Sequence, residues 1–82
     1  MRFLRIDDVL LATGHRSHTT IYNAVRDGLF TKPVPIGTRS VGWPDHEVLA
    51  ICAARLAGQT IEEVRTLVNQ LHTRRSAYAQ GV

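Results

Sequence analysis

The spacing of apolar residues along this chain changes twice, and the changes separate helical segments from an extended one. Residues 7–13 and 17–28 carry apolar side chains three and four positions apart, which predicts two short helices joined by a tight turn. Gly14 is expected to stop the first helix. Ser17 is a good N-cap for the second, and Gly28 stands where a left-handed residue would end it.

After residue 28 the pattern becomes extended. Residues 32–36 predict an edge strand because they contain two prolines, residues 37–40 predict a turn, and residues 41–43 predict the returning strand. An isolated hairpin is marginal in water, so this one must lean on the helices. The side chains expected to make that contact are Val34, Ile36, Val41 and Trp43. Such a hairpin beside two helices is either a wing or an extended connector.

Two more helices follow the hairpin. Pro44 and Asp45 favour the start of a third helix, which Gly58 ends. The sequence from Thr60 to Glu63 is a capping box, and the fourth helix runs to about Ala77. The buried stripe of the third helix is expected to contain Val48, Ile51, Cys52 and Leu56. The apolar residues expected on one side of the fourth helix are Ile61, Val64, Leu67, Val68 and Leu71. Residues 1–5 are expected to be a lead-in that covers the core with Phe3 and Leu4, and residues 80–82 a frayed tail.

The apolar stripe of the fourth helix is compatible with two arrangements. Its alternating spacing resembles a coiled-coil seam, but it lasts only about two heptads before Arg75 interrupts it. A helix this short must pack on something. We expect it to pack on its own third helix, with self-association through any exposed remainder. The other arrangement is a pairing with the same helix of a second protomer.

These elements predict a mainly α protein. Residues 1–58 form a winged helix-turn-helix domain with a small two-stranded β-hairpin wing, and residues 59–82 add a C-terminal amphipathic helix and tail.

The charge of the chain is unevenly distributed. Its 82 residues carry a net charge of +3, which is modest. The segment from His15 to Trp43, however, contains four basic residues and one acidic residue. The basic residues are Arg16, Arg26, Lys32 and Arg39, and the acidic one is Asp27. The other acids stand near predicted helix starts, at Asp7 and Asp8, Asp45 and Glu47, and Glu62 and Glu63, where the helix dipole favours them. The basic footprint therefore coincides with the second helix and the hairpin.

One face of the second helix is polar and almost free of carboxylates. Amides and guanidinium groups form paired hydrogen bonds with base edges, and hydroxyls suit phosphates. On the helix alone an ordinary solvated face is the simpler interpretation, but the basic setting and the wing favour a DNA-binding face. The candidate DNA-binding residues are Arg16, Ser17, His18, Thr19, Thr20, Tyr22, Asn23, Arg26, Lys32, Thr38, Arg39 and Ser40.

Roles within this set differ. Thr20 and Asn23 are expected to read base edges in the major groove, and Arg39 is expected to enter an adjacent minor groove. Tyr22 has two alternatives: contact with the DNA, or partial burial against the first helix.

Other chemistry is poorly represented. His15 and His18 lack a third ligand nearby, so no metal is expected, and His46 and His72 are interpreted as solvated. Cys52 is interpreted as a small buried residue of a reducing cytoplasm. No motif for phosphate binding or nucleophilic catalysis occurs, so we expect neither an enzyme nor a cofactor. No membrane span or signal peptide is recognisable, which favours a soluble cytoplasmic protein.

Several motifs resemble the AlpA family of small prophage regulators. They are Phe3-Leu4-Arg5-Ile6, Asp8-Val9, Thr13-Gly14, Ser17 to Tyr22, Gly28-Leu29-Phe30, Lys32-Pro33-Val34, Ile36-Gly37, Arg39, Gly42-Trp43 and Glu47-Val48. The resemblance covers roughly residues 2–55. Many members have an apolar residue where this chain has His15, so the packing of the turn should differ from that of relatives. Many also have arginine where this chain has Asn23, so the base preference should differ as well. The segment after Gly58 lies outside the pattern.

The resemblance implies an excisionase-like or MerR-like winged helix-turn-helix protein. It implies a sequence-specific DNA-binding transcriptional regulator of a prophage or integrative mobile element, acting as activator, repressor or excisionase. The partners implied are double-stranded DNA and either integrase or RNA polymerase; a homodimer or cooperative binding on DNA stays open. The alternative is a protein-interaction module that uses the basic helix face to bind an acidic protein.

Overall fold

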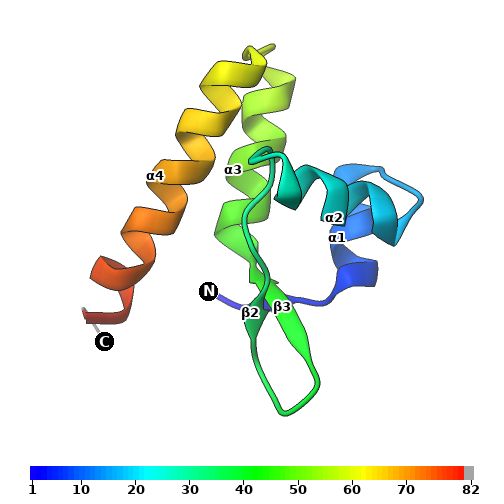
Figure 1. Ribbon diagram of the computed structural model, residues 1–82, viewed down its shortest axis with the longest axis vertical. Coiled ribbons are helices and arrows are strands. Elements are labelled where there is room, and N and C mark those ends of the chain that lie inside the picture. Colours follow the sequence, from blue (N-terminus) through cyan, green and yellow to red (C-terminus); the bar gives the residue numbers. More distant parts are fainter. Residues whose placement is uncertain (81–82) are drawn as a thin grey trace.

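The computed structural model describes residues 1–80, which form four helices and a small sheet around a central helix (Figure 1). Helix α3 lies in the middle, with α1 and α2 on one side of it and α4 on the other, while the hairpin of β2 and β3 projects from the end at which α3 begins. In chain order the elements are β1 (Phe3–Leu4), α1 (Ile6–Thr13), α2 (His18–Arg26), β2 (Val34–Pro35), β3 (Val41–Pro44), α3 (Asp45–Leu56) and α4 (Ile61–Gln80). The mainly α fold predicted from the sequence is confirmed.

The predicted helix ends are set by local hydrogen bonds. Ser17 caps α2, because its Oγ accepts a hydrogen bond from the backbone N–H of Thr19 at 3.1 Å. Thr60 and Glu63 form the reciprocal capping box at the start of α4, with distances of 2.9 and 3.1 Å. Gly28 follows α2 with a φ of 76°, a left-handed conformation in which a side chain would be strained.

The sheet has one strand more than the sequence predicts. Its order is β1-β3-β2, and both pairings are antiparallel. Phe3 pairs with Pro44 and Leu4 with Trp43, so the expected lead-in is in fact an edge strand. Two residues carry too little local pattern to predict a strand, because this one is defined by a partner some 40 positions away.

Trp43 occupies the centre of the core. It is fully buried, and its indole N–H donates a hydrogen bond to the backbone carbonyl of Thr31 at 2.7 Å. Phe30 meets the indole edge to face, with ring centroids 6.1 Å apart. The buried apolar cluster contains residues from all four helices, from β1 and β3, and from the segment between α2 and β2: Leu4, Val9, Ile21, Phe30, Trp43, Val48, Ile51, Ala54, Val64, Val68 and Leu71.

Helix α4 packs on α3, as expected, and adds three of its apolar side chains to this core. It continues to Gln80 rather than ending near Ala77. Gln80 is therefore helical rather than part of a frayed tail, and Gly81 and Val82 lie outside the described residues. The domain division at residue 58 stays a prediction.

Several apolar side chains are more exposed than the sequence pattern predicts. Leu56 and Ile61 are 91% and 59% exposed, because they flank the turn between α3 and α4. Ile36 is 39% exposed and lies past the end of β2, in the segment that leads to the tip of the hairpin. Cys52 is only half-buried, with its Sγ 3.7 Å from the carbonyl oxygen of Ala12.

Candidate nucleic-acid interface

The second helix of the pair, α2, buries one face and leaves the other open. Ile21 is 1% exposed within the core, and Ala24 and Val25 pack against the cluster from its margin. The candidate residues of this helix and of the turn before it are all exposed: Arg16, Ser17, His18, Thr19, Thr20, Tyr22, Asn23 and Arg26. The structure thus brings the sequence-predicted polar side chains together on the solvent side of one short helix.

Tyr22 is shared between the core and the surface. Its ring meets that of Trp43 edge to face with centroids 5.9 Å apart, and 42% of the residue remains exposed. It therefore packs against the Trp43 indole of β3, a contact that the sequence did not predict. The indole fixes the ring in position, while its hydroxyl end stays within reach of a ligand.

Two polar side chains of this surface already have partners within the protein. His18 lies 3.0 Å from the carboxylate of Asp7 on α1, and Arg26 lies 3.0 Å from that of Asp27. The hydrogen bond from Arg26 lowers the pKa of Asp27, and the same contact raises the pKa of Arg26. Both contacts are exposed, and an exposed ion pair such as that of Arg26 with Asp27 contributes little to stability. Asp7 is a contact that the sequence did not signal, because α1 meets α2 only in the fold.

The hairpin presents a second polar group. Its turn is closed by a hydrogen bond of 2.9 Å from the backbone N–H of Ile36 to the carbonyl of Ser40. Thr38 and Arg39 at the tip are exposed, and Ser40 is half-buried. Lys32, which precedes β2, directs its exposed side chain to solvent while both its backbone polar groups are bound by α4.

Side chains of α4 hold the backbone at the end of α2 and at the start of the hairpin. Sequence reasoning did not predict these contacts. Arg65 donates a hydrogen bond of 3.2 Å to the carbonyl of Asp27 at the end of α2. His72 accepts the backbone N–H of Lys32 at 3.0 Å, and Arg75 donates to the carbonyl of Lys32 at 2.7 Å. The prediction of a solvated His72 is therefore wrong. These contacts join residues about 40 positions apart, so local patterns do not reveal them.

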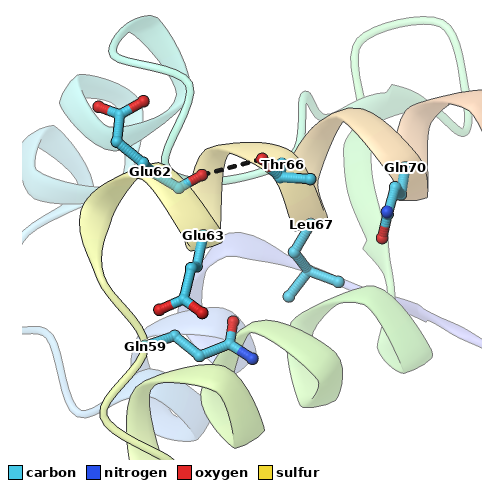
Figure 2. Close-up of a pocket in the computed structure, with 6 residues that line it drawn as sticks. All are labelled: Gln59, Glu62, Glu63, Thr66, Leu67 and Gln70. Carbon is cyan, nitrogen blue, oxygen red and sulfur yellow. Dashed lines mark hydrogen bonds between the residues drawn. The ribbon is translucent and has the colours of Figure 1, made fainter.

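A shallow polar hollow lies near the start of α4 (Figure 2). It has a volume of about 380 Å³ and is lined by Gln59, Glu62, Glu63, Thr66, Leu67 and Gln70. Both carboxylates are occupied: Glu62 pairs with Arg65 at 2.7 Å, and Glu63 belongs to the capping box. We assign no ligand chemistry to this hollow. Among residues 1–80, no three histidine, cysteine or acidic side chains are placed to share a metal ion.

The fold and this surface define a class: a small, mainly α domain in which a helix pair with an exposed polar helix stands beside a wing-like hairpin. The family profile described as "Prophage CP4-57 regulatory protein (AlpA)" matches residues 2–56. The chain therefore belongs to the AlpA family of prophage regulatory proteins.

A relative is found in Enterobacteria phage P4. The protein, described as "Uncharacterized protein ORF88", is 41% identical over 58 residues, which cover 71% of this chain and 65% of the phage protein. No solved structure matches the chain. No helix within residues 1–80 is both long and apolar enough to cross a membrane.

Proposed function

We propose that this protein is a sequence-specific DNA-binding regulator of a prophage or integrative element. The observation that carries the proposal is the exposed polar face of α2, on which Thr20, Asn23 and Arg26 stand together on a helix anchored by Ile21. A helix of this size fits the major groove, and amide and guanidinium groups match the hydrogen-bonding edges of bases. Membership of a prophage regulatory family supports the same conclusion.

In this proposal α2 reads base edges in the major groove of the DNA, and the hairpin reaches the adjacent minor groove. Thr20 and Asn23 contact base edges, while Ser17, His18 and Thr19 contact the phosphates beside the start of the helix. Arg39 enters the minor groove next to the core site, with Thr38 and Ser40 on the flanking backbone. Arg16 and Lys32 add cationic charge at the two ends of this surface.

A regulator of this kind acts on the bacterial chromosome in the cytoplasm, either as a transcription factor that contacts RNA polymerase or as an excisionase that bends DNA beside an integrase. The two differ in what they do to DNA. An excisionase should change the mobility of a duplex according to where the site lies along it, because a bend at the centre retards migration most. A transcription factor of the activating type needs no such bend.

Gel-shift titration tests the proposal. The purified protein should shift random-sequence duplex weakly at low salt and bind a selected site about a thousandfold or more tightly. Affinity for random duplex should fall steeply as salt is raised, because bound phosphates release counterions. Failure to shift any duplex at low salt would favour the alternative, a module that binds an acidic protein through the same helix face.

A further inference from the structure

The three-stranded sheet is apolar on both faces. Leu4 and Trp43 pair across the sheet and face the core. On the opposite face Phe3 pairs with Pro44, and Val34 pairs with Gly42. An antiparallel sheet with one face on the core normally carries polar side chains on the other. Phe3 is nevertheless 42% exposed, so this second face is an apolar surface that the fold leaves partly uncovered.

Gly42 keeps this second face closely packed. A Cβ at this position would lie 3.1 Å from the Cβ of Phe3 and 3.2 Å from Cδ1 of Ile36. The side chains of Phe3 and Ile36 therefore occupy the space that a side chain at residue 42 would need. The result is a continuous apolar floor across β1, β3 and the end of β2.

The second half of α4 forms a wall beside this floor and turns it into a groove. The groove has a volume of about 450 Å³, and its apolar lining includes Met1, Phe3, Val34, Pro44, Leu71 and Tyr78. Tyr78 is 51% exposed and stacks on His46, with ring centroids 5.4 Å apart. Large exposed apolar patches bordered by polar residues commonly mark sites of protein interaction.

The unpaired charge at the groove is positive. Among the described residues that line it, Glu47 is the only one with a carboxylate, and its side chain is 1% exposed and held by two hydrogen bonds from Arg75. Arg74, on the neighbouring position of α4, is exposed and has no carboxylate partner among the described residues. An apolar groove with a free guanidinium at its edge is complementary to apolar side chains that stand next to a carboxylate.

We propose that this groove binds a peptide segment of a protein partner in which Asp or Glu stands beside aromatic or aliphatic residues. The apolar side chains lie on the sheet floor against Tyr78, and the carboxylate pairs with Arg74. Helix α4, whose second half forms the wall of the groove, and α2 lie on opposite sides of α3 (Figure 1). A partner bound against this part of α4 therefore leaves the polar face of α2 free. The partner can thus be recruited while α2 is occupied.

Selection from a library of random short peptides, with the full-length protein as bait, tests this proposal. Peptides that pair acidic with apolar residues should be enriched, and their affinity should then be measured by fluorescence anisotropy. Arg74→Glu should weaken binding about tenfold or more, because it places like charges together. Tyr78→Ser should weaken binding as well, by removing an apolar wall. Arg55→Glu is the matched control, since Arg55 is an exposed arginine of α3 outside the groove, and it should leave binding unchanged.

Three results would overturn the proposal. The first is a selection without acidic-apolar enrichment, or one whose peptides bind Arg74→Glu as well as wild type. The second is a concentration-dependent dimer of the wild type that Arg74→Glu abolishes, which would make a second copy the occupant. The third is a loss of affinity for random duplex in Arg74→Glu that exceeds the loss in Arg55→Glu, which would assign the groove to DNA. Circular dichroism of both variants confirms that they fold, and intact DNA binding by Arg74→Glu separates this proposal from that of the α2 surface.

Discussion

The carboxylate of Glu47, fully buried at the start of α3, is held by the guanidinium of Arg75 near the far end of α4. The two hydrogen bonds measure 2.6 and 2.8 Å, and the same guanidinium donates to the carbonyl of Lys32 at 2.7 Å. One side chain thus joins three segments: α3, α4 and the chain that leads into the hairpin. Arg75 belongs to the part of the chain beyond the family match at residue 56, yet its partners Lys32 and Glu47 lie within it.

Replacing Arg75 should destabilise the fold more than any other surface arginine of α4. Arg75→Met leaves a buried carboxylate without a counter-charge, which costs about 3 kcal/mol or more in the free energy of unfolding. Urea denaturation measures the loss. Arg74→Met is the matched control and should change stability by about 0.5 kcal/mol or less, because Arg74 is exposed. The double variant Glu47→Leu with Arg75→Met should recover most of the stability, and a double variant as unstable as Arg75→Met would contradict this account.

His72 should make stability depend on pH. Its ring nitrogen accepts the N–H of Lys32, which only a neutral ring can do. Burial lowers the pKa of His72, the charges of Arg75 and Lys32 lower it further, and Glu47 opposes them. Because the pKa is lower in the folded than in the unfolded chain, the contribution is complete above the ordinary value of 6.5 and is lost as pH falls through the folded value.

The measurement is the free energy of unfolding from about pH 7 down to about pH 5. His72→Gln keeps a hydrogen-bond acceptor but has no titrating ring. As pH falls, the wild type should therefore lose more free energy of unfolding than this variant does. A constant difference between wild type and His72→Gln across this range would show that the contact does not depend on protonation.

Sequence reasoning succeeded where the determining contact is local. The caps at Ser17 and Thr60 involve neighbours two or three positions away, so residue type and spacing predict them. It failed where the contact is distant. The strand at Phe3 exists only because Pro44 lies beside it, and the role of Arg75 depends on Glu47, 28 positions earlier.

The candidate interface likewise has features that the sequence predicts and features that depend on distant contacts. The exposed face of α2 follows from helical spacing, because burying Ile21 turns Asn23 and Thr20 outward. The side-chain contacts of that face do not follow from spacing. The position of Tyr22 depends on Trp43, a residue of the hairpin, and pattern along α2 alone could not choose between its two predicted roles.

Removal of the Thr31 hydroxyl should not harm the protein. Thr31 is fully buried, and its Oγ1 has no hydrogen-bond partner among residues 1–80, so the folded state carries an uncompensated desolvation cost. Thr31→Val keeps the shape and should leave stability unchanged or raise it by about 1 kcal/mol. Thr60→Val is the control: its hydroxyl caps α4, and its loss should cost about 1 kcal/mol. Thermal denaturation of both variants gives the comparison, and a Thr31→Val loss as large as that of Thr60→Val would indicate a hydroxyl contact within the fold.

Asn23 should contribute to sequence selection more than to general affinity. An asparagine pairs best with adenine, so an A·T pair is expected at the position it contacts. Asn23→Ala should lose about 1–3 kcal/mol on the selected site and little on random duplex. Gel shifts on the two duplexes at one salt concentration measure both. Equal losses on both would make Asn23 a residue that positions the helix rather than one that reads a base.

Arg39 should act through the shape of the DNA beside the core site. It stands exposed at the tip of the hairpin, in a turn closed by the bond between Ile36 and Ser40, and no carboxylate among the described residues pairs with it. A-tracts narrow the minor groove and concentrate its negative potential, which attracts an inserted guanidinium. Arg39→Ala should therefore weaken binding most on sites flanked by A-tracts, and less on sites flanked by G·C pairs. Arg55→Ala, which removes an arginine from α3, should change the affinity for both kinds of site by the same factor. Equal affinities of wild type and Arg39→Ala on every flank would make the hairpin a packing element, since the sheet that carries it also supplies Trp43 to the core.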